Sequence, residues 1–162
     1  MILTLICSML FLNVFAPSVK YDGRSYEEMI RKELFDQRKE ILLKAIIKAE
    51  RPNSLEQAKA ARLREDAVGV LQIRPVMVRA CNEILGYQKY FLNDRNDSIR
   101  SVEMFYLFQN HFNPDFNPEI AAYLWNGGEG FKKANNRTKR ALSIYWMKVN
   151  INLKNLNDHA TK

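Results

Sequence analysis

The segment KEILLKAIIKAERP, residues 39–52, determines how the middle of this chain folds. Its apolar residues recur at intervals of three and four, which is the spacing of one face of an α-helix. They are Ile41, Leu42, Ala45, Ile46 and Ala49. Pro52 disfavours helical geometry at the residue before it, so we expect the helix to end at about Glu50. The segment therefore predicts a carboxylate at a helix C-terminus, beside an apolar face.

The regions on either side of this segment carry weaker signals. Ser25 is followed three residues later by Glu28, which is the capping-box pattern that begins a helix. The pattern leaves open whether that helix breaks near Asp36. Residues 54–64 are polar with interspersed Ala and Leu, and they fit either a solvated helix or a structured loop.

The second half of the chain predicts further helices. We expect them over residues 75–86, 97–112 and 117–126, because Pro, Asp or Asn opens each one and turn residues follow it. Residues 87–96 suit a loop, and Thr138 suits the cap of a last helix. The 97–112 helix should bury one apolar stripe, formed by Ile99, Val102, Met104 or Phe105, Phe108 and Phe112. No stretch alternates as a strand would, so the predicted fold class is all-α.

Length and composition favour an N-terminal signal peptide followed by one domain. A chain of 162 residues fits a single compact unit. Residues 1–18 are almost continuously apolar and uncharged, which is typical of a secretory signal peptide; an uncleaved anchor or a buried helix is the alternative. We therefore expect an exported, periplasmic or envelope-associated protein. Residues 19–38 form a linker and N-terminal helix in this scheme, residues 39–156 the domain, and residues 157–162 a tail.

The charge of the chain limits which classes of binding partner are plausible. Its formal net charge is +7, and the basic residues are dispersed among acidic ones with no run of five. An anionic partner is plausible, but a dedicated nucleic-acid surface is not expected. The two histidines are isolated, so the sequence predicts no metal site and no cofactor. Cys81 is expected to be a small apolar side chain on a helix face.

Four separated pieces of sequence suggest chemistry when they are taken in order. They are Glu50, GVLQI at residues 69–73, YLWNGG at residues 123–128 and YWMKV at residues 145–149. A carboxyl group can protonate a glycosidic oxygen near neutral pH only if its pKa is raised by an apolar setting. Glu50 at the end of an apolar helix fits that need.

These pieces resemble the soluble lytic transglycosylase family of the lysozyme-like superfamily. That family has Glu-Ser, then Gly-Leu-Met-Gln-Ile, then Ala-Tyr-Asn-Ala-Gly, and a final Tyr-Val-x-x-Val helix. The resemblance covers roughly residues 41–149 and implies a lysozyme-like single domain that cleaves peptidoglycan glycan strands. It implies a monomer whose Glu50 acts first as acid and then as base, and it allows association with envelope machinery.

The resemblance also implies a set of substrate-binding residues. Amide side chains would hydrogen-bond the sugars, glycines would let the glycan approach the backbone, and aromatic rings would either stack on sugars or pack in the core. The residues in these roles are Gln72 and Asn126, Gly69 and Gly127, and Trp125 and Tyr145.

Two departures from the family pattern leave alternatives open. Arg51 replaces the Ser after the acid, and Trp125 stands where a Tyr hydroxyl is expected, so Tyr123 or Tyr145 would have to supply that hydroxyl. One alternative is a goose-type-like muramidase in which Asp66 activates water, about 6.5–9.5 Å from the acid. The other is a non-catalytic protein that binds or helps to assemble the cell wall on the same fold.

Overall fold

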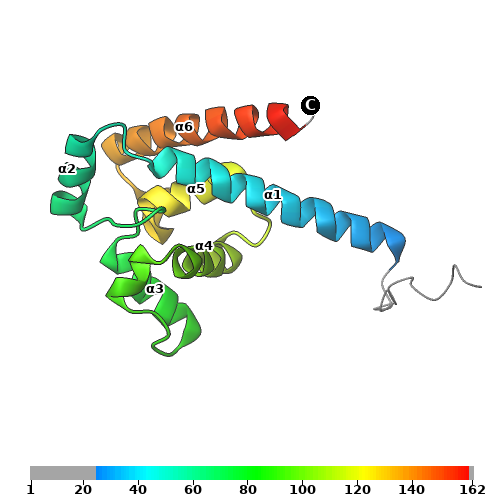
Figure 1. Ribbon diagram of the computed structural model, residues 1–162, viewed down its shortest axis with the longest axis horizontal. Helices are drawn as coiled ribbons and strands as arrows, with labels where there is room; N and C mark the ends of the chain where they lie inside the picture. The colour runs from blue at the N-terminus through cyan, green and yellow to red at the C-terminus, as the bar shows by residue number, and fades with distance from the viewer. Residues whose placement is uncertain (1–24, 161–162) are drawn as a thin grey trace, which may run out of the picture. The chain divides into compact units, whose positions relative to one another are not determined.

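The structure is a computed structural model that describes residues 25–160, apart from the side chains of Ala58, Ala61 and Ala160. Within this range the chain is all-α, as expected, and it contains no strand. The leader expected over residues 1–18 lies outside the described residues. The elements are α1 (Tyr26–Glu50), α2 (Leu55–Glu65), α3 (Pro75–Leu85), η1 (Leu92–Asn96), α4 (Ser98–Phe112), α5 (Pro118–Gly127), η2 (Glu129–Lys133) and α6 (Asn136–Ala160) (Figure 1).

Helix α1 begins and ends at the residues that the sequence predicts. The Ser25 hydroxyl accepts a hydrogen bond from the Glu28 backbone N–H at 3.2 Å, and the Glu28 carboxylate accepts one from the Ser25 N–H at 2.9 Å. The helix is continuous through Asp36 and ends at Glu50. The chain divides into two units after Phe35, inside α1.

The other helix ends follow local capping chemistry. Asp97 caps α4 by accepting hydrogen bonds from two backbone N–H groups, and Asn117 caps α5 in the same way, as predicted. The Ser54 hydroxyl caps α2, so residues 55–65 form a helix rather than a loop. The expected Thr138 cap is wrong, because the Asn135 side chain accepts from the Thr138 N–H at 2.9 Å and α6 begins at Asn136. α6 then continues to Ala160, beyond the expected domain end at residue 156.

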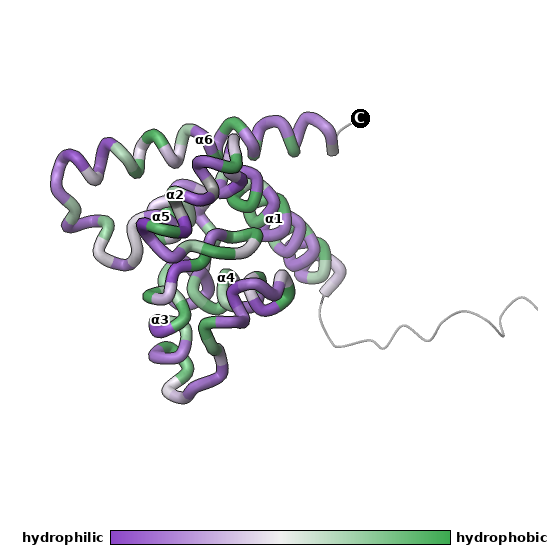
Figure 2. Tube along the Cα trace, turned by 60° about the vertical axis from the view of Figure 1, so that its left-hand side comes forward, coloured by the Kyte–Doolittle hydropathy of each residue, from purple (hydrophilic) through white to green (hydrophobic). Residues whose placement is uncertain are grey.

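The core lies where the apolar faces of these helices meet. Helix α5 packs against α6 and α4, and α3 packs against α4. Helix α6 runs beside the second half of α1 (Figure 1), and it is mainly hydrophilic with isolated hydrophobic residues (Figure 2). The buried α1 residues are Leu42, Leu43, Ala45, Ile46 and Ala49. In α4 the predicted stripe is correct at Phe105 and Phe108 but wrong at Ile99, which is 71% exposed.

A tight turn between α2 and α3 brings the GVLQI segment into this core. Val68 and Ile73 exchange two backbone hydrogen bonds, of 3.2 and 2.9 Å, and Gln72 donates backbone and side-chain N–H groups to the Gly69 carbonyl. Gly69 has a φ of +79°, and a Cβ atom there would overlap the Arg95 carbonyl oxygen. Glycine is therefore required by the packing of the chain against itself.

We predict that Gly69→Ala lowers the free energy of unfolding by about 2–4 kcal/mol, because it combines left-handed backbone strain with a steric clash. Gly86 is the matched control, since it has a φ of +74° and no other atom within 4 Å of the point where a Cβ would lie. Gly86→Ala should therefore cost only about 1 kcal/mol, from strain alone. Urea unfolding of both variants measures the difference, and equal losses would contradict the clash with Arg95.

Candidate active site

A cavity of about 260 Å³ lies at the C-terminal end of α1. The end of α2, the 68–73 turn, the start of α3, the end of α5 and the first half of α6 also contribute side chains to it. It brings together five of the residues that the sequence singled out, Glu50, Gln72, Trp125, Asn126 and Tyr145. Gly69, Gly127 and Asp66 do not line it. Segments up to 95 positions apart in the sequence therefore meet at Glu50.

Glu50 is held by a hydrogen bond from α6. The Tyr145 hydroxyl donates to Glu50 Oε1 at 2.6 Å. Burial raises the pKa of Tyr145 well above its ordinary value of 10.0, so the phenol keeps its proton and acts as the donor. Within residues 25–160, Glu50 Oε2 has no hydrogen-bond partner. One carboxyl oxygen is thus fixed by the protein, and the other is available to carry a proton.

The pKa of Glu50 is raised from 4.5 to about 7, chiefly because burial disfavours the charged carboxylate. The Tyr145 hydrogen bond and the positive charges of Lys148 and Arg74 lower the pKa, while the negative charge of Glu65 raises it. The position at the C-terminus of α1 also disfavours a negative charge. Burial is the largest of these effects, so Glu50 can be protonated at neutral pH.

Three residues on one face of α6 hold the last turns of α1. In addition to the Tyr145 bond, the Lys148 ammonium donates to the Ala49 carbonyl, and Asn152 Nδ2 donates to the Ala45 carbonyl at 3.1 Å. Their spacing of three and four residues is the repeat of one helix face. The Lys148 contact satisfies a carbonyl group, that of Ala49, which the helix C-terminus leaves without an intrahelical partner. The three contacts also fix the position of the Glu50 backbone.

Trp125 is part of the structural support of the cavity. Its side chain is 5% exposed, and its ring packs edge-on against Phe105 with ring centroids 5.1 Å apart. The indole N–H donates to the Leu71 carbonyl at 3.3 Å, which ties α5 to the 68–73 turn. Of the two roles that the sequence allowed for Trp125, this geometry favours core packing over stacking on a sugar.

Trp125 stands where the family pattern has a tyrosine, and Tyr145 is the candidate to supply the absent hydroxyl group. Tyr145 contacts Glu50, whereas the Tyr123 hydroxyl donates to Glu119 Oε1 at 2.7 Å, away from the cavity. Gly127 likewise has a packing role, since a Cβ there would lie 2.9 Å from the Leu142 side chain. It permits close contact between α5 and α6.

Asp66, the proposed second carboxylate, is held by Arg95. The Arg95 side chain is only 6% exposed, and it donates to the Asp66 and Ile73 carbonyls and, at 3.2 Å, to Asp66 Oδ2. These bonds join η1 to both ends of the 68–73 turn. This buried arginine could not be predicted, because nothing in the local sequence pattern distinguishes it from a surface arginine.

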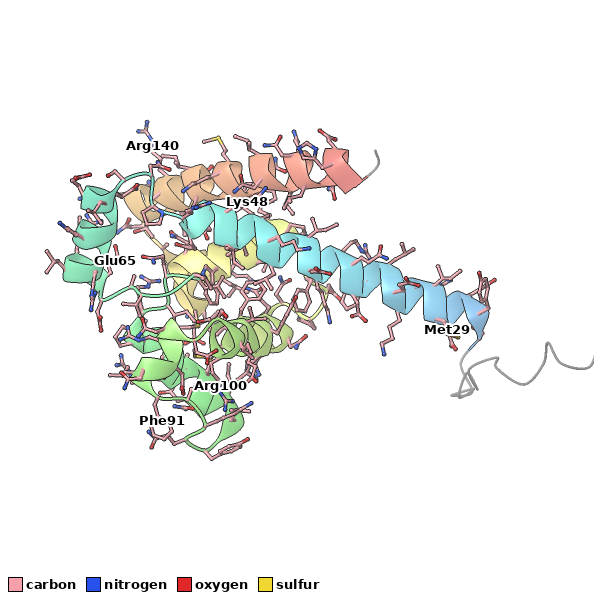
Figure 3. The ribbon with its side chains drawn as sticks, in the orientation of Figure 1. Met29, Lys48, Glu65, Phe91, Arg100 and Arg140 are labelled. Atoms are coloured by element: carbon pink, nitrogen blue, oxygen red, sulfur yellow. The ribbon has the colours of Figure 1, made fainter. Side chains whose placement is uncertain are left out.

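The acidic side chain that does line the cavity beside Glu50 is Glu65, at the end of α2 (Figure 3). Glu65 Oε2 lies 3.7 Å from an Arg74 nitrogen, and Glu65 Oε1 lies 3.6 Å from Arg64 Nε. Arg74 also donates to the Asn126 carbonyl at 3.0 Å. This network connects α2, the start of α3 and the end of α5 across the cavity.

Basic side chains line the cavity around Glu50, and of these the sequence singles out only Arg51, the residue after the acid. Arg51, Arg64, Arg74 and Lys148 all line the cavity. Lys148 could have been found, since it lies three residues after Tyr145 on the same helix and so shares its face. Arg64 and Arg74 could not, because their convergence on Glu50 depends on how α1, α2 and α3 are arranged.

Comparisons with known proteins identify no family or function for this chain. The chain matches no known protein family, no curated protein and no solved structure. Among the described residues, no three His, Cys, Asp or Glu side chains converge as metal ligands would. No helix in residues 25–160 is both long enough and apolar enough to cross a membrane. Any assignment of function rests on the site itself.

We predict that Tyr145→Phe raises the pKa of Glu50 above about 7, because the hydrogen bond that it removes stabilises the charged carboxylate. NMR titration of the Glu50 carboxyl carbon measures the midpoint. Tyr123→Phe is the matched control and should leave it unchanged, since Tyr123 bonds to Glu119. A midpoint that stays in place or falls in Tyr145→Phe would contradict this account.

The raised pKa also predicts how stability depends on pH. The folded-state pKa of Glu50 is about 7 and its ordinary value is 4.5, so stability falls as pH rises from 4.5 to 7 and the unfolded chain ionises first. Glu50→Gln removes this loss and should be more stable than wild type at pH 8, by up to about 3 kcal/mol. The advantage should shrink greatly at pH 4.

Denaturant unfolding at both pH values tests this expectation. Glu83→Gln is the control, because Glu83 is exposed on α3 and has no ion pair among the described residues. An advantage of Glu50→Gln that is equal at pH 4 and pH 8 would rule out a buried, titrating carboxyl group at this position.

Proposed function

We propose that this chain is a peptidoglycan lytic transglycosylase with a lysozyme-like fold, which cleaves the bond between N-acetylmuramic acid and N-acetylglucosamine. The observation that carries the proposal is Glu50, whose pKa is about 7 and whose Oε1 is held by Tyr145 at the wall of a cavity. A general acid works best when its pKa is close to the working pH. The ordered motifs at residues 69–73 and 123–128 support the same reaction.

The proposed reaction uses the Glu50 carboxyl group twice. Protonated Glu50 gives its proton to the glycosidic oxygen, and the bond from muramic acid C1 to that oxygen breaks. The Glu50 carboxylate then takes the proton of the muramic acid C6 hydroxyl, whose oxygen bonds to C1. The products are an N-acetylglucosamine end and a 1,6-anhydromuramic acid end, and Glu50 is protonated again. No water molecule is consumed.

Each Glu50 partner has a role in this scheme. The Tyr145 bond to Oε1 orients the carboxyl group and leaves Oε2 for the proton. Lys148 and Arg74 stabilise the carboxylate formed after the first proton transfer, because both positive charges lower its pKa. Gln72 and Asn126 line the cavity with amide groups that suit sugar hydroxyl and acetamido groups.

The geometry favours this reaction over a muramidase that uses Asp66. A hydrolase of that kind needs a second carboxylate to activate water. Asp66 is bound through its carboxylate and its carbonyl to Arg95, and it does not line the cavity. Glu65 does line it, but two arginines pair with its carboxylate. Among the described residues that line the cavity, Glu50 is thus the carboxyl group that pairs with no cation, which supports a mechanism that needs only one carboxyl group.

The non-catalytic alternative rests on Arg51 and Trp125. The Tyr145 hydroxyl donates to the Glu50 carboxyl group, so Glu50 has an orienting partner although position 125 is a tryptophan. Arg51 lines the cavity and leaves Glu50 Oε2 without a hydrogen bond within residues 25–160. The proposed substrate is in the cell envelope, so the proposal includes export of the chain. It also includes action on glycan strands as a monomer.

Mass spectrometry of digested peptidoglycan tests the proposal. Wild type should release soluble fragments ending in 1,6-anhydromuramic acid, and Glu50→Gln should release them at least about 100-fold more slowly. Glu119→Gln is the matched control and should be fully active, since Glu119 is exposed on α5 away from the cavity.

The other outcomes separate the alternatives. Fragments with reducing muramic acid ends would indicate a muramidase and contradict the transglycosylase reaction. Absence of soluble fragments from wild type, or full activity in Glu50→Gln, would overturn the enzymatic proposal.

A further inference from the structure

Helix α6 carries a row of exposed apolar side chains. Ile144, Met147 and Ile151 follow one another at intervals of three and four residues, so they lie on one face of the helix. Each of these side chains is more than half exposed, at 54–59%. Single exposed apolar residues are common on proteins, whereas a continuous row of them indicates a surface that contacts another body.

This row faces away from the residues that α6 packs against. Val149 of α6 is fully buried, and Met147 lies about 200° from it around the helix. Tyr145, which bonds to Glu50, also lies on the inner side. Within residues 36–160, α6 runs along one edge of the structure in two views (Figure 1; Figure 2). A partner that contacts the row therefore leaves the Glu50 cavity open.

The same part of the chain carries most of the net charge, although its basic residues form no long run. Residues 132–160 contain seven Lys and Arg and one Asp, so they supply +6 of the formal net charge of +7. Arg137, Arg140 and Lys154, at the two ends of the row, are exposed and form no ion pair with any described residue. Arg140 projects from the outer side of α6 (Figure 3). A partner of this surface should be anionic and should also accept apolar side chains.

We propose that α6 binds an anionic lipid bilayer through its outer face. This face consists of the apolar row and the cations at its ends, namely Arg137, Arg140, Ile144, Met147, Ile151 and Lys154. A helix that lies in a bilayer interface inserts its apolar side chains between the lipids. Its Lys and Arg side chains reach the lipid phosphates on long aliphatic stems. The outer face of α6 contributes no group to the Glu50 reaction, so the proposal goes beyond the proposed function.

Other occupants use only part of this face. A soluble polyanion would pair with the cations but would gain nothing from the apolar row. A second copy of the chain would bring two clusters of positive charge together. Three apolar side chains also bury far less than the roughly 800 Å² per partner of a stable protein interface. A bilayer uses both the charges and the apolar row, and it requires no matching groove.

Co-sedimentation of the full chain with lipid vesicles tests the proposal. One set of vesicles contains equal parts of phosphatidylglycerol and phosphatidylcholine, and the other contains phosphatidylcholine alone. Wild type should bind the anionic vesicles at least about tenfold more tightly, and added salt should reduce this preference. Residues 1–18 contain no charged side chain, so lipid binding by that segment would not produce the preference.

The contribution of charge is measured with the double variant Arg137→Gln and Arg140→Gln. It should weaken binding to anionic vesicles about tenfold or more, because each cation near an anionic surface contributes about fivefold. The matched control is Arg62→Gln with Arg79→Gln, which makes the same change in net charge. Arg62 and Arg79 are exposed on α2 and α3 and form no ion pair with described residues. This control should stay within about twofold of wild type.

The contribution of the apolar row is measured with the double variant Ile144→Ser and Ile151→Ser, which keeps the net charge. It should also weaken binding about tenfold or more, because it removes apolar surface that the bilayer would shield from water. The matched control is Leu55→Ser with Leu63→Ser, two exposed positions on α2, which should stay within about twofold of wild type. All four substituted positions are exposed, so both variants should keep the fold, and urea unfolding checks this.

Four results would overturn the proposal. Equal binding of wild type to both kinds of vesicle, or no loss in the arginine double variant, would exclude recognition of anionic lipid by this face. No loss in the isoleucine double variant would indicate a site for soluble polyanions. A dimer in sedimentation equilibrium that the isoleucine double variant abolishes would indicate self-association instead.

Catalysis is tested separately from lipid binding. Glu50→Gln should bind anionic vesicles as wild type does, because Glu50 lies in the cavity and not on the outer face of α6. Vesicle binding by a chain that cleaves no glycan would overturn only the proposed function. Glycan cleavage by a chain that binds no vesicles would overturn only the lipid-binding proposal.

Discussion

The hydrogen bond from the Tyr145 hydroxyl to Glu50 Oε1 connects the two parts of the chain on which the cavity depends. It places the acid at the junction of α1 and α6. Lys148 and Asn152 extend the same contact by donating to backbone carbonyls in the last turns of α1. Because all three donors lie on one face of α6, any rotation or shift of α6 against α1 would disturb all three bonds together.

Opposing effects set the pKa of Glu50. Burial favours the neutral acid, while Tyr145, Lys148 and Arg74 favour the carboxylate. The two cations also serve other acceptors: Lys148 binds the Ala49 carbonyl, and Arg74 binds the Asn126 carbonyl and Glu65. Burial outweighs the effects that favour the carboxylate, so the pKa of Glu50 is about 7. This value lets one group give and then take a proton at neutral pH.

Local chemistry explains which features could be predicted from the sequence. Pro52, Asp97 and Asn117 each act on backbone geometry or on N–H groups within a few residues, so the end of α1 and the starts of α4 and α5 follow from the sequence alone. The position of Glu50 follows in the same way. The start of α6 differs from the expected one by three residues because two capping residues, Asn135 and Thr138, compete there, and Asn135 caps the helix.

Features that depend on tertiary packing could not be predicted in this way. Gly69 is expected from the sequence to admit a substrate, but the Arg95 carbonyl occupies the space beside it. Asp66 is expected to face the cavity, but it binds the buried Arg95. Ile99 fits the apolar stripe by spacing, yet it is exposed among the described residues. Arg95, which is distant in sequence, determines the surroundings of Gly69 and Asp66. The exposure of Ile99 depends on which of the described segments pack against α4.

The proposed reaction depends on Glu50 being the proton donor at neutral pH. Its most direct test is the pH dependence of kcat/KM for the release of soluble fragments from peptidoglycan, which reports the ionisation of groups in the free enzyme. If Glu50 is the proton donor, kcat/KM falls as pH rises through about 7, where Glu50 loses its proton. A value of kcat/KM that stays constant from about pH 5 to pH 9 would contradict it.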